Sequence, residues 1–342
     1  MRAAVLGAGG WGTALSVQLA RVGWQVSLWA RRQELAEQLE QTRENITYLP
    51  GVSLPRSISF TWQLEEALSG RELVVLSVPS QSLRALLEKI SPDLWQGDPL
   101  LLQTAKGLEL GSLLRLSEVV SQCVPPRLKS RIVVLSGPNH AEEIARGFPA
   151  ASVVASTSDA AAKHAQEYLM GNTFRIYTNR DLVGVELGGA LKNIIAMAAG
   201  MCHGLGLGDN TKATLITRGL AEIVRLGSKL GGQPPTFAGL SGMGDLIATA
   251  GSSHSRNWRA GYQIGQGKDP GQVLAGPFVV EGAPTARSAL ALAQKLAVPM
   301  PITDELCAVL AGKDPALAVQ SLMCREPKVE ADHSGWWARG EE

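Results

Sequence analysis

The sequence has little of what marks a secreted, metal-binding or nucleic-acid-binding protein. Its four cysteines form no C-x-x-C pair and show no zinc-ligand spacing with histidine, so we expect reduced thiols and no metal site. A formal net charge of +1 offers no basic surface to nucleic acid or to an anionic membrane. The N-terminus lacks the basic segment and the longer apolar core of a signal peptide. We therefore expect a cytoplasmic protein.

Long hydrophobic runs are scarce as well. The most apolar stretch, residues 187–207, contains Lys192, Asn193 and His203 together with several glycines, which makes it a poor transmembrane span. Charged residues make up only 18% of the chain and hydrophobic residues 45%, a balance typical of a compact globular protein. Because 342 residues exceed what one hydrophobic core usually organises, we expect two domains.

Glycine, in contrast, is abundant, with 37 residues, and the most informative ones lie near the N-terminus. A short apolar strand over residues 2–6 leads into Gly7-Ala8-Gly9-Gly10-Trp11-Gly12, which opens a helix over residues 13–22. This G-x-G-x-x-G pattern, placed between a strand and a helix, is typical of a dinucleotide-binding βαβ unit. Gly7 permits the tight turn, Gly9 lets a pyrophosphate approach the backbone, and Gly12 lets the helix pack close to the strand. A structural turn without a ligand is the alternative interpretation.

A second strand, over residues 25–30, ends in Arg31-Arg32, where an NAD-specific protein carries a carboxylate for the ribose 2′-hydroxyl. Guanidinium groups at this place suit a 2′-phosphate instead, through bidentate charge-assisted hydrogen bonds and stacking on adenine. The alternative is that both arginines are solvated surface charges. We therefore expect NADPH to bind at least as well as NADH.

The first half of the chain alternates strands with helices. Runs of Val, Leu and Ile predict further strands, and such continuous runs are typical of a parallel sheet covered on both faces. These runs lie at residues 73–78, 100–104, 132–136, 153–156 and 174–178. We therefore predict an α/β, Rossmann-type dinucleotide-binding domain over residues 1–181, with its ligands beyond the carboxyl ends of the strands.

From about residue 182 the strand pattern stops, and we predict an all-helical substrate domain over residues 182–330. The expected helices cover residues 185–201, 211–230, 261–264, 283–296, 303–311 and 315–322. Residues 331–342, rich in tryptophan, glycine and charge, are expected to form a loose tail.

Lys192 is the outstanding ionisable residue of the second half. It is the only side chain with a full formal charge between Glu186 and Asp209, and its neighbours are small or apolar. Burial lowers the pKa of an ammonium group toward the range useful for proton transfer. The alternative is that Lys192 reaches solvent from an amphipathic helix. The adjacent Asn193 offers a donor and an acceptor to a substrate.

A second group of polar residues follows a glycine-rich segment, residues 239–244, which lets backbone approach a ligand closely beside Asp245. A loop then ends in Ser255-Arg256-Asn257, whose hydroxyl, guanidinium and amide donors suit a phosphate group. A polar surface loop with a structural arginine is the alternative. His254 has no suitably spaced carboxylate to orient it as a base.

Together these motifs resemble the bacterial-type NAD(P)-dependent sn-glycerol-3-phosphate dehydrogenases, over nearly the whole chain. The matching segments are Gly7-Ala8-Gly9-Gly10-Trp11-Gly12-Thr13-Ala14-Leu15, Tyr48-Leu49-Pro50, Val78-Pro79-Ser80, Thr104-Ala105-Lys106-Gly107, Ser136-Gly137-Pro138, Lys192-Asn193, Thr217-Arg218-Gly219-Leu220, Gly242-Met243-Gly244-Asp245-Leu246, Ser255-Arg256-Asn257 and Glu281-Gly282. The resemblance implies a helical domain like the C-terminal domain of 6-phosphogluconate dehydrogenase. It also implies reversible reduction of dihydroxyacetone phosphate to sn-glycerol 3-phosphate, the backbone precursor of glycerophospholipids.

The resemblance further implies roles for individual residues. It makes Lys192 the proton donor and acceptor, with Lys106 and Asp245 as its catalytic partners. It places the substrate among Lys106, Gly137, Asn139, Lys192, Asn193, Asp245, Ser255, Arg256 and Asn257. It places NADPH or NADH against Gly7, Gly9, Gly10, Trp11, Gly12, Arg31, Arg32, Lys106, Ala141, Arg256, Val279 and Glu281.

Two positions depart from the family pattern. Gly10 stands where the family often has serine, so one hydroxyl contact to phosphate is missing and only the backbone can serve. Asn139-His140 replaces the commoner pair of a small hydroxyl residue and Phe, which changes the side-chain contacts expected from residue 139.

The sequence leaves two rival interpretations open. One is another two-domain NADP-dependent dehydrogenase that acts on a hydroxyacyl thioester or a ketoacid, although the hydroxyacyl type would want a His–Glu dyad. The other is a catalytically silent NADP(H)-sensing module, which the joint presence of Lys106, Lys192, Asp245 and Arg256 disfavours. A homodimer is expected from the resemblance and from the apolar faces of the helical domain.

Replacing both Arg31 and Arg32 with alanine should weaken NADPH binding by about tenfold to a hundredfold, because hydrogen bonds to a charged group contribute roughly 1.5–3 kcal/mol. NADH affinity should change little, since NADH carries no 2′-phosphate. Fluorescence titration of each cofactor against the wild-type protein and the double variant measures the difference. An equal loss for both cofactors would contradict the assignment.

Overall fold

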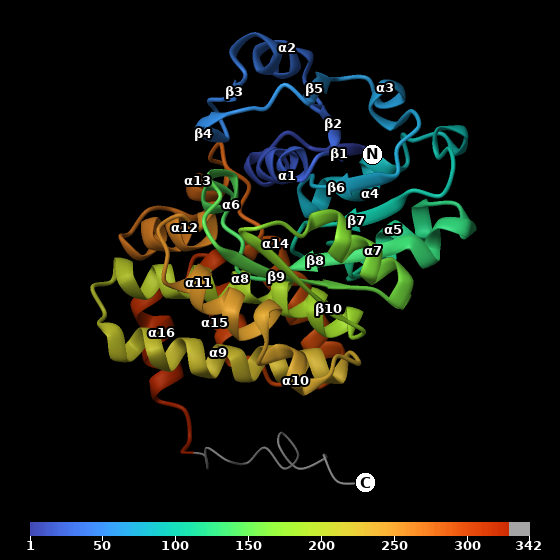
Figure 1. Ribbon diagram of the computed structural model, residues 1–342. Helices are drawn as coiled ribbons and strands as arrows, with labels where there is room; N and C mark the ends of the chain where they lie inside the picture. The colour runs from blue at the N-terminus through green and yellow to red at the C-terminus, as the bar shows by residue number, and fades with distance from the viewer. Residues whose placement is uncertain (328–342) are drawn as a thin grey trace, which may run out of the picture.

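The computed structural model describes residues 1–327, which form an α/β part followed by a helical part (Figure 1). The sheet with helices packed around it lies toward the N-terminus, and the helices of the second part gather beneath it. This arrangement confirms the predicted fold class. The predicted tail over residues 331–342 lies outside the described residues.

An eight-stranded sheet is the centre of the α/β part. Its strands, in order across the sheet, are β10 (Phe174–Asn179), β9 (Ala150–Ala155), β8 (Ile132–Ser136), β7 (Leu100–Gln103), β6 (Leu73–Leu76), β1 (Arg2–Leu6), β2 (Gln25–Trp29) and β5 (Ile58–Thr61). Val5 and Leu6 are neighbours in β1, yet they belong to two separate apolar clusters. Because successive side chains of a strand point to opposite faces, both faces of the sheet are covered.

The expectation of an all-parallel sheet is wrong at one edge. Strand β9 runs antiparallel to β8, with Leu135 opposite Val154, and β10 runs parallel to β9. The reason lies in the connection from β8 to β9, because its only helix, α6 (Ala141–Arg146), has six residues. A helix of that length spans about 9 Å, whereas a five-residue strand spans about 17 Å. The chain therefore does not cross back over the sheet, and it enters β9 beside the carboxyl end of β8.

Helices and one hairpin complete the α/β part. The helices are α1 (Gly10–Arg21), α2 (Gln33–Thr42), α3 (Leu64–Leu68), α4 (Leu83–Leu87), α5 (Leu116–Cys123), α6 and α7 (Asp159–Leu169). The hairpin pairs β3 (Glu44–Asn45) with β4 (Leu49–Ser53) and was not predicted. Strands as short as these leave no hydrophobic alternation that a sequence pattern could reveal.

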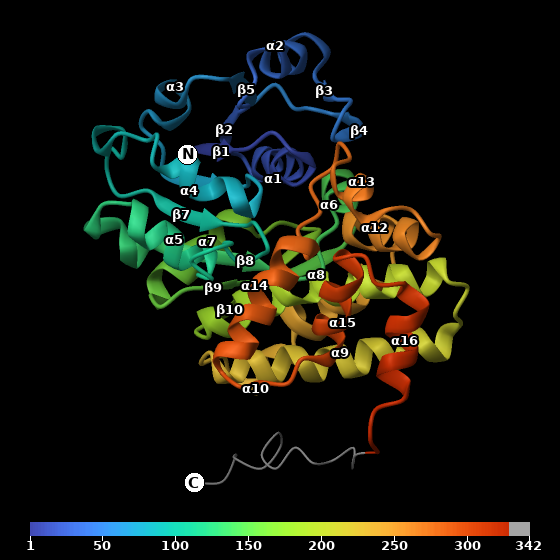
Figure 2. The same cartoon turned by 180° about the vertical axis from the view of Figure 1, so that it is seen from behind.

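The helical part is built around α8 (Leu182–Gly204), which lies against the sheet half in both views (Figures 1 and 2). The other helices are α9 (Asp209–Lys229), α10 (Pro234–Phe237), α11 (Asp245–Ala250), α12 (Arg256–Gly265), α13 (Pro270–Leu274), α14 (Gly282–Lys295), α15 (Pro301–Leu310) and α16 (Pro315–Met323). A π-helical turn, Leu240–Gly244, leads into α11. By length and composition α8 could cross a membrane, but 83% of its most apolar window is buried inside the protein. The helix is therefore packed as a core element.

Glycines let α12 approach α8 to backbone contact. A Cβ atom on Gly200 would lie 2.0 Å from the carbonyl oxygen of Trp258, and one on Gly261 would lie 1.9 Å from that of Met197. Neither distance leaves room for a side chain. The close approach fixes the start of α12, which carries Arg256 and Asn257, relative to the helix that carries Lys192.

Candidate active site

The glycine-rich turn after β1 leaves backbone N–H groups without partners and open space above them. Gly7 has a φ of +122°, and a Cβ atom on Gly12 would lie 1.9 Å from the carbonyl oxygen of Gly7, so both positions require glycine. Nothing lies within 4 Å of a Cβ atom on Gly9. Helix α1 has no side-chain cap and no acidic residue in its first turn, so its first N–H groups are free for phosphate oxygens. The Ser77 hydroxyl, buried beside this turn, has no hydrogen-bond partner among the described residues.

The β3–β4 hairpin forms one wall of this turn and explains Gly10. The Asn45 amide donates to the carbonyl of Ala8 at 3.0 Å and to the Thr13 hydroxyl at 2.7 Å, while its oxygen accepts from the N–H of Tyr48 at 3.2 Å. A Cβ atom on Gly10 would lie 2.7 Å from the carbonyl oxygen of Tyr48. A serine at position 10 would therefore collide with the hairpin. No role had been assigned to Asn45 from the sequence.

Arg31 and Arg32 lie close to the same turn. Strand β2 pairs with β1, and the N–H of Gly7 donates to the carbonyl of Trp29 at 3.1 Å, so the end of β2 adjoins the glycines. Both arginines are exposed, and neither forms an ion pair with any residue in the range 1–327. Their guanidinium groups are therefore available to an anion beside the dinucleotide site.

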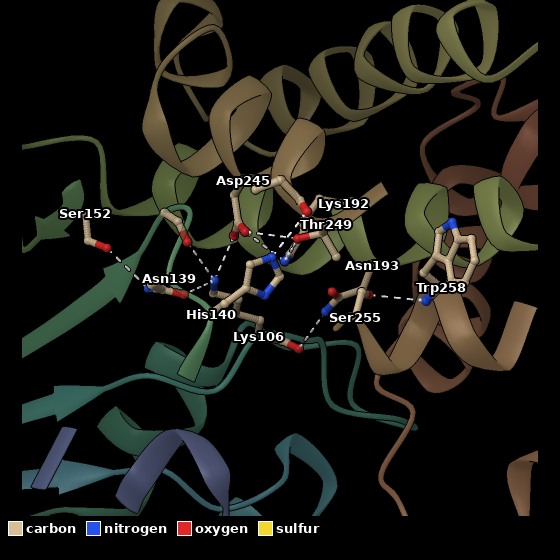
Figure 3. Close-up of polar contacts among 12 residues, drawn as sticks. Lys106, Asn139, His140, Ser152, Lys192, Asn193, Asp245, Thr249, Ser255 and Trp258 are labelled. Carbon is tan, nitrogen blue, oxygen red and sulfur yellow. Dashed lines mark hydrogen bonds and ion pairs between the residues drawn. The ribbon is translucent and has the colours of Figure 1, made fainter. Parts of the chain in front are cut away.

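Three charged side chains meet where the sheet faces the helical part (Figure 3). Asp245, the first residue of α11, accepts from Lys192 at 2.8 Å through Oδ1 and from Lys106 at 2.7 Å through Oδ2. Lys106 also donates to the carbonyl of Gly137 at 3.0 Å and to the Asn139 side chain at 2.8 Å. One carboxylate thus joins an ammonium group of the α/β part to one of the helical part.

The alternative that Lys192 reaches solvent is wrong, since its side chain is only 7% exposed. Burial lowers the pKa of Lys192 from 10.5 to about 8, with Asp245 opposing this shift and Lys106 adding to it. Burial by itself raises the pKa of Asp245, but the two lysines outweigh it and hold that pKa below its usual value. The Asp245 carboxylate is therefore charged at neutral pH. The Lys192 amine titrates at a pH of about 8.

Thr249 completes the cluster, although no role had been assigned to it from the sequence. It lies one turn after Asp245 on α11, and its hydroxyl accepts a hydrogen bond from Lys192 and donates to Asp245. The i,i+4 spacing of Asp245 and Thr249 on one helix face is the signal that would have revealed it. Thr249 holds the Lys192 amine from a second direction.

The residues expected to bind phosphate divide into two groups. Ser255 accepts from the N–H of Trp258 at 3.2 Å, and Asn257 accepts from the N–H of Gly282 at 2.8 Å, so both oxygens hold helix starts. The Asn193 amide donates to the carbonyl of Lys106 at 3.4 Å. Arg256 is exposed and has no hydrogen-bond partner among the described residues. Arg256 is thus the cation of this group that is free to meet an anionic ligand.

The remaining expected cofactor contacts lie along the junction of the two halves. Ala141 is the first residue of α6, and Val279 is exposed ahead of α14. Glu281 accepts from the N–H of Ser80 at 2.8 Å and also from the Ser80 hydroxyl, so its carboxylate joins the helical part to the sheet. Burial raises the pKa of Glu281, against the lowering effect of these hydrogen bonds.

His140, the second residue of the departing pair, also spans the junction. Its Nε2 lies 3.2 Å from the carbonyl oxygen of Ala248 on α11, next to the lysine cluster (Figure 3). A phenylalanine at this position has no polar atom for such a contact. Asn139 also lies beside the lysine cluster, because its side-chain oxygen accepts from Lys106. Its amide group donates to the Ser152 hydroxyl at 3.3 Å.

Comparison with known proteins agrees with this arrangement. The family model for the N-terminus of NAD-dependent glycerol-3-phosphate dehydrogenase matches residues 2–162, and the model for its C-terminus matches residues 181–320. The glycerol-3-phosphate dehydrogenase (NAD(P)+) of Moorella thermoacetica is 52% identical over 336 residues, covering 98% of each chain. That of Halalkalibacterium halodurans is 49% identical over 332 residues, covering 96% of each chain.

Solved structures that resemble this chain also include a glycerol-3-phosphate dehydrogenase. The crystal structure of glycerol-3-phosphate dehydrogenase from Coxiella burnetii superposes with a TM-score of 0.89 at 37% identity, over 95% of this chain and 99% of that one. A D-mandelate dehydrogenase with bound NADH superposes over 92% of this chain with a TM-score of 0.61, but its 15% identity shows a common fold alone. The relatives and the Coxiella burnetii structure do not favour the ketoacid alternative. Because two family models together match most of its length, this chain belongs to the NAD(P)-dependent glycerol-3-phosphate dehydrogenase family.

Proposed function

We propose that this protein interconverts dihydroxyacetone phosphate and sn-glycerol 3-phosphate with NADPH or NADH, and supplies glycerol 3-phosphate for glycerophospholipid synthesis. The observation that carries the proposal is the buried amine of Lys192, held by Asp245 at 2.8 Å and by Thr249. A group that protonates an alkoxide at neutral pH needs a pKa near the working pH, and that of Lys192 is lowered to about 8. The names of the close relatives support the same reaction.

NADPH or NADH, when bound, supplies the hydride that reduces the ketone. The chain provides the free N–H groups at the start of α1 for its pyrophosphate, and Arg31 with Arg32 for a 2′-phosphate, which is why we propose a preference for NADPH. The buried Ser77 hydroxyl without a partner and the open space over Gly9 fit a ligand at this turn.

The cluster of Lys106, Lys192 and Asp245 would stabilise the negative charge that develops on the ketone oxygen. Protonated Lys192 donates its proton to that oxygen, and Lys106 stabilises the negative charge electrostatically. Asp245 orients both amines, since each of its oxygens accepts from one lysine. In the reverse direction neutral Lys192 removes the proton from the hydroxyl group of glycerol 3-phosphate.

The phosphate of the substrate would lie against Arg256 and the free donors of Ser255, Asn257 and Asn193. A charge-assisted bond from Arg256 turns remote binding energy into alignment of the ketone. The exposed guanidinium of Arg256, without a partner among residues 1–327, supports this role.

Organisation and location form a further part of the proposal. We propose a division into a dinucleotide-binding domain over residues 1–181 and a substrate domain over residues 182–330, which the change from β10 to α8 supports. We also propose a cytoplasmic homodimer that does not insert into membranes. Two exposed apolar residues on α16, Leu317 and Met323, support a contact between subunits at the helical part.

Replacing Lys192 with methionine should reduce turnover of dihydroxyacetone phosphate by about 10²- to 10⁴-fold or more, because the proton donor is lost while the volume is kept. NADPH binding should stay within about twofold, since Lys192 lies apart from the glycine-rich turn. Loss of nicotinamide absorbance measures turnover, and fluorescence titration measures binding. The matched control is Lys89→Met at an exposed lysine of the same protein, which should keep full activity. Near-normal turnover in Lys192→Met would exclude the assigned role.

The pH dependence should follow the titration of Lys192. Ketone reduction needs the protonated amine, so kcat/KM should fall as the pH rises through about 8. Oxidation of glycerol 3-phosphate needs the neutral amine and should instead rise through the same pH. Steady-state rates in both directions, measured from about pH 6 to pH 10, check this pair of curves. If both directions responded to pH in the same sense, Lys192 would not be the titrating group.

Replacing Arg256 with alanine should raise the KM for dihydroxyacetone phosphate by about tenfold to a hundredfold, because a charge-assisted bond to phosphate is lost. The weak reduction of unphosphorylated dihydroxyacetone should be nearly unaffected, since that molecule has no phosphate to bind. The control Arg175→Ala removes an exposed arginine from edge strand β10. It should change neither the KM for dihydroxyacetone phosphate nor the rate with dihydroxyacetone. An equal loss on both substrates would argue against a phosphate contact.

A further inference from the structure

A cavity of about 320 Å³ lies at the end of the sheet opposite the lysine cluster. Its lining includes Arg71, Glu72, Gln96, Asp98, Arg131 and Tyr168. Glu72, Asp98 and Arg131 precede strands β6, β7 and β8, which lie side by side in the sheet (Figure 1). The candidate active site uses residues that follow the same three strands, so the two sites lie at opposite strand ends.

Arg131 is the unusual residue of this cavity. It makes no hydrogen bond or ion pair with any residue in the range 1–327, and its Nε is buried without a partner. A buried donor without a partner costs free energy unless water or a ligand satisfies it. Arg131 lines the cavity, and the rest of the described chain uses none of its N–H groups.

Arg71 supplies a second guanidinium group, already held in place. It donates to the carbonyl of Ala67 at 2.7 Å and to that of Glu66 at 3.0 Å, both in α3. These bonds leave other N–H groups of the same fork free. An arginine oriented in advance loses less side-chain entropy when it binds an anion.

The two carboxylates in the lining, those of Glu72 and Asp98, interact with groups other than Arg71 and Arg131. Glu72 accepts from the backbone N–H of Arg2 at 3.0 Å and lies 4.0 Å from the terminal amino group. Asp98 pairs with Arg127 at 3.4 Å. Burial lowers the pKa of Arg71, the nearby charge of Arg2 lowers it further, and the charge of Glu66 opposes both effects.

Tyr168 adds an aromatic wall with further unused polar atoms behind it. Its ring packs edge-on against Trp24 at 4.8 Å and stacks on His164 at 6.0 Å between ring centroids. The Trp24 Nε1 and the His164 Nδ1 atoms are both buried without a partner among the described residues. Tyr168 thus gives the cavity an aromatic side whose ring is held in place by Trp24 and His164.

We propose that this cavity binds a small oxyanion of the phosphate class, held by the guanidinium groups of Arg131 and Arg71, at a site separate from the active site. Guanidinium forks match the geometry of phosphate oxygens and bind them through paired charge-assisted hydrogen bonds. The volume is at the lower end for small-molecule pockets, which leaves room for a short organic group beside Tyr168. The shared chemistry is a phosphate group, either free or as a phosphomonoester.

The test uses the Arg256→Ala variant, because phosphate would also bind at Arg256 in the wild-type protein. Inorganic phosphate is titrated at constant ionic strength, and binding is measured by calorimetry and by the rise in melting temperature. Arg256→Ala should bind phosphate, and adding Arg131→Gln should weaken that binding by about tenfold or more. The matched control adds Arg56→Gln, an exposed arginine outside the cavity, and should keep the binding.

Arg131 makes no internal hydrogen bond, so Arg131→Gln should fold normally, which circular dichroism and the unliganded melting temperature check. Arg131→Lys is the second variant, and because it keeps the charge but loses the fork, it should bind with intermediate affinity. Phenyl phosphate in place of inorganic phosphate distinguishes the sources: tighter binding indicates a phosphomonoester and equal binding indicates free phosphate. No phosphate binding in Arg256→Ala, or equal weakening by Arg131→Gln and Arg56→Gln, would overturn the proposal.

Discussion

The structure depends on the carboxylate of Asp245 more than on any other single group. Two ammonium groups cannot be buried a few ångströms apart without an anion between them, since each would lose its hydration and repel the other. Asp245 accepts from Lys192 at 2.8 Å and from Lys106 at 2.7 Å, and the three groups together carry one net positive charge. Such a charge, held away from bulk water, is suited to meet a developing oxyanion.

The same interaction joins the two halves of the protein. Lys106 follows β7, whereas Lys192 and Asp245 lie on α8 and α11 of the helical part. Glu281 makes a second connection, from the start of α14 to Ser80 after β6. Polar side chains, rather than apolar area alone, therefore set how the substrate-binding helices lie over the carboxyl ends of the strands.

Small residues set how closely these elements approach. A Cβ atom on Gly189 would lie 2.3 Å from the Ser136 hydroxyl, so the α8 face next to Lys192 contacts the end of β8. Further along the same helix, Gly200 admits the backbone of α12. The long apolar composition of α8 is thus explained by contact with both halves, and Lys192 is buried because its helix is surrounded.

Local sequence was enough to predict the Rossmann-type turn. The spacing of Gly7 and Gly12 between an apolar strand and a helix reflects steric limits within a few residues of chain. The direction of β9 was not predictable in this way, because it depends on how far α6 carries the chain. The hairpin behind Gly10 was also missed, since its anchor, Asn45, reaches across to Ala8 and Thr13.

The sequence by itself determined which groups are present: a phosphate-binding turn, two arginines after β2, and one lysine on an apolar helix. Only the tertiary structure decided what these groups do. Lys192 is buried rather than solvated, and its partner Asp245 lies 53 positions further along the chain. Glu281 and Ser80 are 201 positions apart. No local pattern records such pairs, because packing between helices and sheet brings them together and removes the water that would otherwise screen their charges.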